Sequence, residues 1–248
     1  MTFGDGNAWG QGGFETTCAH SENSGSVDLL YAVRHGQSTA NVAFATDTAI
    51  DSDDMAIGLT DLGERQAIAV GRWFASLDSD QVPDLVLCSP YLRAAQTWQL
   101  IEQELRAAER ELPCHHIDQR LYDRHRGKLS HMPPSTVRER FPEELVQEAA
   151  DPLGYRPPDG ESFRDVADRL RGVVADLETD QRHHRVLIVA HDAIVLFLRQ
   201  LLENLTDTAV LALAEAGLAG NGSITSWQRT ANGYHLLAYD QRTHLPQH

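Results

Sequence analysis

Apolar residues along this chain form two kinds of pattern that alternate in the sequence. Short, nearly unbroken apolar runs cover Asp28 to Val33, Asp84 to Cys88 and Arg185 to Ala190, and such runs are typical of buried strands. We expect a further short strand at Cys114 to Ile117. Between them, apolar residues recur every three or four positions, which indicates amphipathic helices. Strands that alternate with helices predict an α/β fold, a three-layer α/β/α sandwich around a mostly parallel sheet.

Helical periodicity follows each of the strand runs. Thr60 is a good N-cap for the first long helix, and Asp192 would complement the N-terminus of the helix after His191. The predicted helices cover Asp61 to Leu77, Leu92 to Glu109, Phe163 to Leu177, the residues after His191, and Asp207 to Ala216. Two late strands are predicted near Ile224 to Gln228 and Tyr234 to Ala238, joined by the hairpin signal Asn232-Gly233.

Two segments depart from this alternation. Residues 1–26 are rich in Gly, Ser, Thr and Asn without periodicity, which predicts a flexible N-terminal tail. Residues 119–160 are rich in proline and carry several basic side chains. We interpret them as a cap inserted into the domain, with one short helix near Ser135 to Phe141. The rest of residues 27–248 is predicted to form one domain.

Composition narrows the range of partners. The chain has 248 residues and a formal net charge of −15, which disfavours nucleic acid and anionic membranes as partners. No apolar stretch is long enough to span a bilayer, and no basic segment followed by an apolar core marks a signal peptide. Three widely spaced cysteines, Cys18, Cys88 and Cys114, suit a reducing compartment and form no metal-binding pattern. We therefore expect a cytoplasmic protein.

Polar groups follow three of the predicted strands at the point where each strand ends. The first strand is followed by Arg34 and His35, the second by Ser89 and then Arg93, and the later one by His191. The carboxyl ends of parallel strands meet at the edge where open α/β sheets bind ligands. Two imidazoles and two guanidiniums at that edge would form an anion pocket, because the planar guanidinium binds phosphate oxygens in pairs.

Three motifs in this order carry a resemblance to a known family. They are Arg34-His35-Gly36-Gln37-Ser38-Thr39-Ala40-Asn41, Leu59-Thr60-Asp61-Leu62-Gly63-Glu64-Arg65-Gln66-Ala67, and Ser89-Pro90 through Thr97. The chain resembles the histidine phosphatase superfamily, with its phosphoglycerate-mutase-like fold. The resemblance covers nearly everything after residue 27 and favours the branch whose first motif ends in Ser-x-x-Asn.

The resemblance implies a two-step reaction through a phosphohistidine. His35 would attack phosphorus, and water would then hydrolyse the phosphohistidine. The residues that would bind the transferred phosphoryl group are Arg34, Arg93, His191, Ser38 and Asn41. Because arginines supply the positive charge, we expect no metal and no other cofactor.

Two carboxyl groups compete for the role of general acid. The family usually places Glu in a segment that matches residues 120–127, and Asp123 occupies that place here. The acid-phosphatase branch instead uses an Asp directly after its second histidine, which is Asp192 in this chain. The Ser-x-x-Asn ending of the first motif favours Asp123.

The resemblance leads to one predicted function and two alternatives. We predict a phosphomonoesterase that acts on a small phosphorylated metabolite. A phosphoglycerate-type mutase would share the phosphohistidine, but mutases carry Gly-Asn-Ser after the second histidine where this chain has Asp192-Ala193-Ile194. The other alternative is a non-catalytic module that binds phosphate.

Two charged segments receive less specific interpretations. The acidic run Asp51 to Asp54 is expected to be a solvated loop. The cluster Arg124, His125, Arg126 and Lys128 lies beside Asp123, and its side chains either are solvated or contact a second anionic group.

Overall fold

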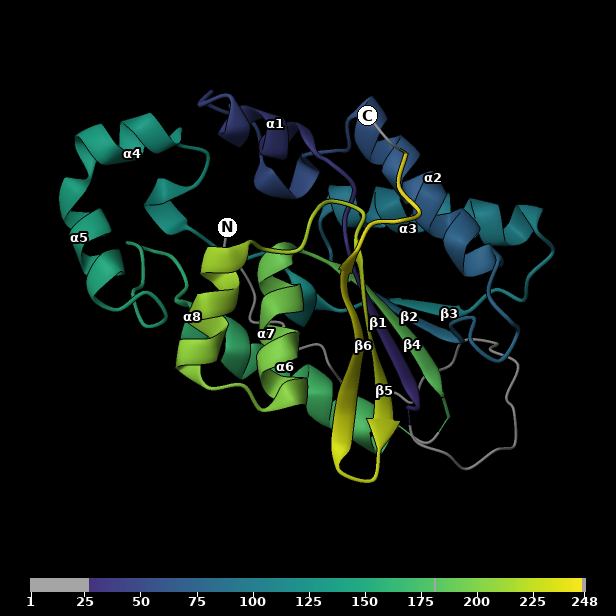
Figure 1. The fold of residues 1–248 in the computed structure, drawn as a ribbon. Helices are drawn as coiled ribbons and strands as arrows, with labels where there is room; N and C mark the ends of the chain where they lie inside the picture. Colours follow the sequence, from purple (N-terminus) through teal and green to yellow (C-terminus); the bar gives the residue numbers. More distant parts are fainter. Residues whose placement is uncertain (1–26, 181, 247–248) are drawn as a thin grey trace, which may run out of the picture.

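The computed structural model describes residues 27–180 and 182–246, so the tail expected at residues 1–26 lies outside the described residues. A six-stranded sheet forms its centre, in the order β3-β2-β4-β1-β5-β6 (Figure 1). Four strands run parallel, whereas β5 and β6 are antiparallel to their neighbours. The strands are β1 (Leu29–Arg34), β2 (Leu85–Cys88), β3 (Cys114–Ile117), β4 (Arg185–Ala190), β5 (Ile224–Thr230) and β6 (Gly233–Gln241).

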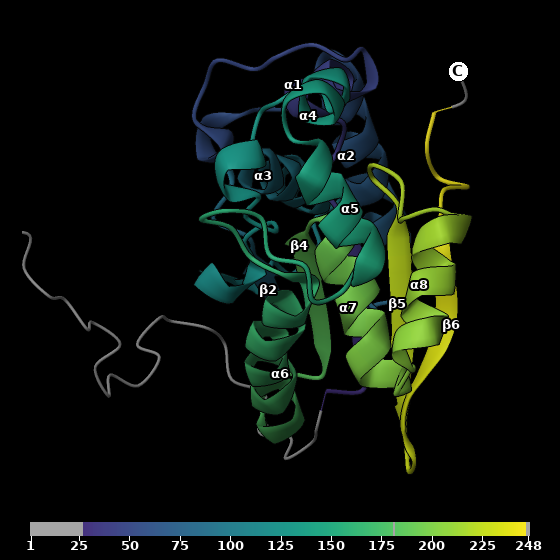
Figure 2. The same ribbon diagram turned by 90° about the vertical axis from the view of Figure 1, so that its left-hand side faces the viewer.

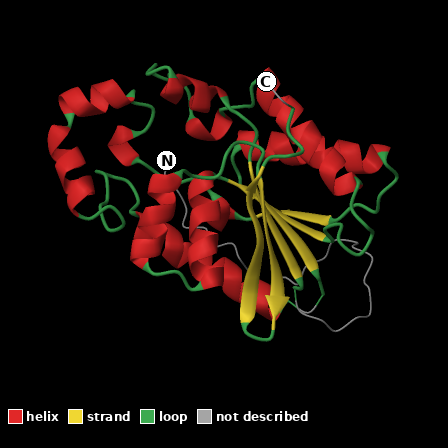
Figure 3. Cartoon of the chain, in the orientation of Figure 1, coloured by secondary structure: helices red, strands yellow, loops and turns green. Residues whose placement is uncertain are grey.

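Eight α-helices accompany the sheet in the described part of the chain (Figure 3). They are α1 (Thr39–Ala45), α2 (Asp61–Ala75), α3 (Leu92–Ala107), α4 (Pro134–Arg140), α5 (Pro142–Ala150), α6 (Phe163–Thr179), α7 (Asp192–Glu203) and α8 (Asp207–Ala216). Three short 3-10 helices lie at Asp54–Ala56, Gln119–Leu121 and Gly127–Leu129. The α/β fold with a mixed, mostly parallel sheet confirms the prediction.

The sheet separates two apolar cores, which gives the molecule its three layers (Figures 1 and 2). Strand β1 supplies both, because successive side chains of a strand point to opposite faces. Leu30 and Ala32 pack in the core beneath α6 and α7, and Tyr31 and Val33 pack in the core beneath α2 and α3. All four side chains are at most 4% exposed, so the middle of this strand is held on both faces.

Parallel register aligns the carboxyl ends of three strands. Arg34 at the end of β1 pairs with Ala190 at the end of β4, and Cys88 at the end of β2 pairs with Val189. The residues that follow these ends therefore start from one edge of the sheet. The backbone continues the ladder by one step, since the N–H of His35 donates to the carbonyl of Ala190 over 2.9 Å.

Two glycines fix the loop after β1 against the start of α2. A Cβ on Gly36 would lie 2.3 Å from the carbonyl oxygen of Gly63, and a Cβ on Gly63 would lie 2.0 Å from that of Gln37. Neither position can hold a side chain without moving main chain. The first two sequence motifs therefore meet through main-chain contact at these glycines.

The segment predicted as a cap contains α4 and α5. The expected short helix is present as α4, but α5 and α1 were not predicted. Neither α1 nor α5 contains a buried residue, so neither is held by packing against the core. The N–H of Ser135 in α4 donates to the Asp47 carboxylate over 2.9 Å, which joins this segment to the loop after α1.

Candidate active site

The carboxyl ends of β1, β2 and β4 bring four predicted side chains together. The ring centroids of His35 and His191 are 5.1 Å apart with the rings nearly edge to face. Only 2% of His35, 1% of His191 and 3% of Arg93 is exposed, and the Arg34 side chain is 16% exposed. Two imidazoles and two guanidiniums thus share one buried site.

The backbone sets the tautomer of His35. Its Nδ1 lies 2.7 Å from the carbonyl oxygen of Gly36, and a carbonyl can only accept, so Nδ1 carries the proton. The lone pair of the neutral ring is then on Nε2. Burial lowers the pKa of His35 well below its ordinary value, and the charges of His191, Arg93 and Arg34 lower it further. The ring is therefore neutral near pH 7, the form that a nucleophile would need.

His191 lies between a hydroxyl and a carboxylate. Its Nε2 is 2.8 Å from Oγ of Ser89, and its Nδ1 is 3.4 Å from Oδ2 of Asp123. Burial lowers the pKa of His191 well below its ordinary value, with Arg93 and Arg34 acting in the same direction. His191 is therefore also neutral near pH 7. As a neutral ring it could hydrogen-bond to an oxyanion without transferring a proton to it.

Arg34 is bound on one side and open on another. Its guanidinium pairs with Asp192 over 2.8 Å and donates to the carbonyl of Ala219 over 2.7 Å. Its Nε is buried and has no hydrogen-bond partner. A buried donor without a partner is costly, so this N–H is suited to an incoming acceptor.

Arg93 projects from the first turn of α3 and is held by two carboxylates. It donates to Asp54 over 2.9 Å and to Asp123 over 3.0 Å, while its guanidinium lies 4.4 Å from the centroid of the Tyr91 ring. A phosphate oxyanion bound here would compete with these carboxylates for the guanidinium.

Ser38 and Asn41 form the N-terminal cap of α1. The Ser38 hydroxyl accepts from the N–H of Asn41, and Oδ1 of Asn41 accepts from the N–H and the hydroxyl of Ser38. Oδ1 also accepts from the amide of Asn221 over 3.0 Å. In this arrangement the Asn41 amide nitrogen could donate to a phosphate oxygen, whereas the Ser38 side chain is used within the cap.

The family follows from the order of these elements and from a direct comparison. Residues 30–242 match the family model described as "Histidine phosphatase superfamily (branch 1)". The chain belongs to branch 1 of the histidine phosphatase superfamily. The match includes both histidines and both arginines of the buried site.

Sequence relatives of this histidine phosphatase family member have more than one activity. The chain is 31% identical over 169 residues to a 6-phosphofructo-2-kinase/fructose-2,6-bisphosphatase of Caenorhabditis elegans, an alignment that covers 67% of this chain and 32% of the relative. It is 30% identical over 187 residues to a 2,3-bisphosphoglycerate-dependent phosphoglycerate mutase of Methylorubrum populi, covering 75% and 84% of the two chains. The chain spans about a third of the length of the bisphosphatase relatives.

Solved structures of phosphatases share the fold. The alpha-ribazole phosphatase of Shigella flexneri is 22% identical with a TM-score of 0.71, over 86% of this chain and 96% of that one. The mycobacterial glucosyl-3-phosphoglycerate phosphatase complexed with VO3 is 23% identical with a TM-score of 0.68, over 86% and 99%. At this identity the likeness shows the fold alone.

The two candidate acids of this family member lie on either side of the buried site. Asp123 contacts Arg93 and His191 through Oδ2, and its Oδ1 accepts from the N–H of Arg124 over 2.8 Å. Asp192 pairs with Arg34 and accepts from the N–H of Ala193 over 2.7 Å at the start of α7.

Burial raises the pKa of Asp192, and the charge of Asp123 adds to the increase although Arg34 opposes it. A raised pKa favours the protonated form that an acid needs, so this carboxyl is a candidate as well as Asp123.

The two charged segments match their expectations in part. Residues 51–53 are exposed as expected, but the carboxylate and the carbonyl of Asp54 both accept from Arg93. The Arg124 side chain is only 8% exposed, pairs with Glu148 over 3.5 Å and lies 3.9 Å from the centroid of the Phe163 ring, so it is not solvated. Lys128 is exposed and pairs with Asp159 over 3.3 Å.

Asn221 was missed by the sequence interpretation. Its amide donates to the carbonyl of His35 over 3.1 Å as well as to Asn41, so it ties the nucleophile's backbone to the cap of α1. The sequence marks it only as part of the turn Gly220-Asn221-Gly222, a signal for a loop and not for a site.

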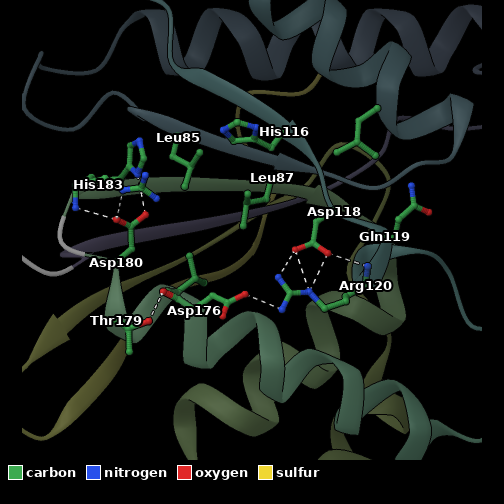
Figure 4. Close-up of a pocket in the computed structure, with 13 residues that line it drawn as sticks. Leu85, Leu87, His116, Asp118, Gln119, Arg120, Asp176, Thr179, Asp180 and His183 are labelled. Atoms are coloured by element: carbon green, nitrogen blue, oxygen red, sulfur yellow. Dashed lines mark hydrogen bonds and ion pairs between the residues drawn. The ribbon is translucent and has the colours of Figure 1, made fainter. Parts of the chain in front are cut away.

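Two pockets lie near the segment that carries Asp123. One of about 560 Å³ lies beside Tyr91 and has Met55, His125, Arg156 and Glu161 among its lining residues. The other, of about 1060 Å³, lies between β2, β3 and α6, and none of its lining residues is a predicted site residue (Figure 4). Gln119 lines both pockets.

The described residues contain neither a metal-binding cluster nor a membrane-spanning helix. Among residues 27–180 and 182–246, no three His, Cys, Asp or Glu side chains are grouped so that they could hold a metal ion. No helix in that same part of the chain is long and apolar enough to cross a membrane.

Proposed function

We propose that this chain is a phosphomonoesterase that acts through a phosphohistidine on a small phosphorylated metabolite. The observation that carries the proposal is the state of His35. This ring is buried, has its Nδ1 proton directed at the carbonyl of Gly36, and has the charges of Arg34 and Arg93 near it. These features support a neutral imidazole whose Nε2 attacks an anion that the arginines attract.

In the first step Nε2 of His35 forms a bond to phosphorus while the bond from phosphorus to the ester oxygen breaks. Asp123 donates its proton to the leaving oxygen, so that an alcohol leaves and the carboxylate remains. Arg34, Arg93 and His191 hydrogen-bond to the other oxygens as negative charge is redistributed over them.

In the second step water attacks the phosphohistidine. The Asp123 carboxylate accepts a proton from that water, the bond from nitrogen to phosphorus breaks, and inorganic phosphate leaves. Each group then returns to its starting state, and no external oxidant, reductant or metal enters the balance.

The comparisons support a small substrate. The two phosphatases of similar fold are named for alpha-ribazole and for glucosyl-3-phosphoglycerate, which are both small metabolites. We propose the same class of substrate here, and a cytoplasmic location.

The test is phosphate release from a panel of phosphorylated metabolites, with His35→Asn as the matched variant. The wild type should release phosphate and carry an acid-labile phosphoryl group after a rapid quench, and His35→Asn should show neither. The loss in turnover should exceed about 10³-fold, because the nucleophile is removed. An exposed histidine on β6 offers the control, since His235→Asn should leave turnover unchanged. Full turnover by His35→Asn would reject this mechanism.

A mutase is the second candidate, because the Methylorubrum populi relative is named as one. A mutase returns the phosphoryl group to an intermediate, so its activity on 3-phosphoglycerate would require a bisphosphate primer. Phosphate release without a primer favours the phosphatase. Binding of phosphate without any turnover would instead indicate the non-catalytic module.

A further inference from the structure

The segment Arg120 to His125 carries the candidate acid, yet it has little regular structure of its own. After the short 3-10 helix Gln119–Leu121, the chain continues as coil to residue 126. A coil residue that donates a proton must be held within a fraction of an ångström of its place. The contacts that hold this segment come from Glu161 and Arg169, on the sequence before α6 and on α6 itself.

Glu161 and Arg169 form a buried, forked ion pair. Nε of Arg169 donates to Oε1 of Glu161 over 2.9 Å and Nη2 donates to Oε2 over 3.2 Å. The side chains are only 10% and 12% exposed. Geometry of this kind restricts both side chains more than a single contact would.

The pair then contacts the segment on both sides of Asp123. Before it, Arg169 donates to the carbonyl of Arg120 and lies 3.8 Å from the centroid of the Tyr122 ring, whose hydroxyl donates to Glu161 over 2.8 Å.

After Asp123, the Arg124 guanidinium donates to the carbonyl of Glu161 over 2.9 Å, and the N–H of Glu161 donates to the carbonyl of His125 over 2.8 Å. The residues immediately before and after Asp123 are thus both bonded to Glu161.

A side chain of the same segment is held from the opposite side. Arg120 pairs with Asp118 over 2.6 Å and with Asp176 of α6 over 2.7 Å, in the larger pocket (Figure 4). Its carbonyl accepts from Arg169, so α6 holds both the main chain and the side chain of this residue.

We propose that Glu161 and Arg169 are positioning residues that hold Asp123 in place for proton donation. The inference rests on the proposed function and on Asp123 as its acid. The pair acts through the backbone of residues 120–125, because both carboxylate oxygens of Glu161 are occupied by Arg169 and one also by Tyr122. Loss of the pair should therefore impair proton donation and leave the attack by His35 largely intact.

The experiment compares two aryl phosphates of similar shape. Phenyl phosphate releases phenolate, whose conjugate acid has a pKa of about 10, and so it needs a proton from the enzyme. Nitrophenyl phosphate has a much better leaving group and needs little help. In Glu161→Gln and Arg169→Met, kcat/KM for phenyl phosphate, which reports formation of the phosphohistidine, should fall about tenfold, a part of the ~10²–10⁴-fold that general acids supply. For nitrophenyl phosphate kcat/KM should fall less than about threefold.

Control variants separate positioning from general damage. Arg171→Met removes an exposed cation two residues along the same helix and should change neither rate. Tyr122→Phe deletes only the hydroxyl that bonds to Glu161, so it tests the same contact should the buried-charge variants fail to fold, and it should lower the phenyl phosphate rate alone. In an Asp123→Asn background, Glu161→Gln should alter the ratio of the two rates by less than about twofold, because the group it positions is already gone.

The outcomes distinguish this inference from the proposed function. A wild type that hydrolyses neither ester would reject the proposed function itself. An active wild type whose Glu161, Arg169 and Tyr122 variants lose both rates equally would overturn the positioning role. So would a Glu161→Gln effect that persists undiminished in the Asp123→Asn background.

Discussion

At the scale of single residues, the backbone decides what the two buried imidazoles can do. The Gly36 carbonyl fixes the Nδ1 proton of His35, and the surrounding arginines disfavour a second proton. The Ser89 hydroxyl lies beside Nε2 of His191, and the Asp123 carboxylate lies beside its Nδ1. The two rings are chemically alike but differ in what their nitrogens contact, and only His35 has an Nε2 for which no contact in the described protein is recorded.

The identity of the acid can be tested with conservative variants. Asp123→Asn should lower kcat/KM for phenyl phosphate by about 10²-fold and for nitrophenyl phosphate by much less, because only the poorer leaving group needs the proton when the phosphohistidine forms. Asp192→Asn should reduce both rates to a similar, smaller extent, since Asp192 pairs with Arg34 at the N-terminus of α7. Steady-state kinetics on both esters provide the measurement. A loss that depends on the leaving group in Asp192→Asn alone would assign the acid to Asp192, in agreement with its raised pKa.

The sequence predicts part of this site for a clear physical reason. Arg34, His35 and His191 directly follow buried strands, and parallel strands bring their ends together whatever the loops do. Asp54 and Asn221 come from loops whose paths depend on tertiary contacts, so no periodicity marks them. The pairing of Arg34 with Asp192 was missed for a different reason: both residues lie at neighbouring strand ends, but no sequence pattern shows which side chains at that edge form an ion pair.

At the scale of elements, main-chain contact between the loop after β1 and the start of α2 sets the position of the loop that follows His35. The loop after His35 approaches the first turn of α2 so closely that both partners must be glycine, Gly36 and Gly63. Gln66 on the same helix accepts from the N–H of Gln37 over 2.8 Å, which adds a hydrogen bond to the contact. The spacing from Thr60 to Gln66 in the second motif is therefore explained by this junction.

Gly63→Ala tests the junction. The added Cβ would meet the carbonyl oxygen of Gln37 at 2.0 Å, so main chain must move, and the free energy of unfolding should fall by about 3 kcal/mol, the upper end of what overpacking costs. Turnover should fall as well, because the movement displaces the loop after His35. Urea unfolding followed by circular dichroism gives the stability, and phosphate release gives the turnover.

Gly172→Ala on α6 is the matched control for that variant. Its Cβ would meet only the end of the Arg120 side chain, at 3.3 Å, and alanine favours a helix over glycine by about 1 kcal/mol. This change should be neutral or slightly stabilising. A Gly63→Ala protein as stable and active as Gly172→Ala would show that the close contact does not matter.

The elements themselves were predictable to different degrees. Helices α2, α3 and α6 each bury one face, which leaves an apolar repeat in the sequence. Helix α7 is instead buried over seven consecutive residues, from Ala193 to Arg199. Helix α1 has a capping box of Ser38 and Asn41, which marks its start in the sequence. Its apolar residues Val42 and Phe44 are exposed, so no buried face marks the rest of the helix. Helix ends are the other difference: α2 and α3 stop two residues before their predicted ends.

At the scale of the whole molecule, local charge matters more than net charge. The chain has a formal net charge of −15, yet the buried site at the sheet edge holds two arginines, each paired with carboxylates, beside two neutral imidazoles. Since the guanidiniums supply the charge that a metal supplies in other phosphatases, turnover should be unchanged in excess EDTA. Phosphate release before and after dialysis against chelator measures this. Inactivation by EDTA that Mg²⁺ or Zn²⁺ reverses would contradict the arginine mechanism.

The buried histidines also couple stability to pH. In the unfolded chain an imidazole takes up a proton near pH 6.5, whereas burial and nearby arginines keep His35 and His191 neutral to much lower pH in the folded protein. Below pH 6.5 the unfolded state therefore binds more protons than the folded state, and the free energy of unfolding must fall as pH falls. Between pH 7.5 and 5.5 each of these histidines should contribute a loss of about 1 kcal/mol.

Urea unfolding of the wild type and two variants across this range tests the coupling. His35→Asn removes one of the two groups that differ between the states, so its stability should depend less on pH by about 1 kcal/mol over the same interval. His235→Asn removes an exposed histidine of β6 and should keep the wild-type dependence. This dependence of stability on pH arises from the burial and the charges that keep His35 neutral. A His35→Asn protein with an unchanged pH dependence would therefore mean that His35 is not held neutral. The proposed attack by its Nε2 would then lose its physical basis.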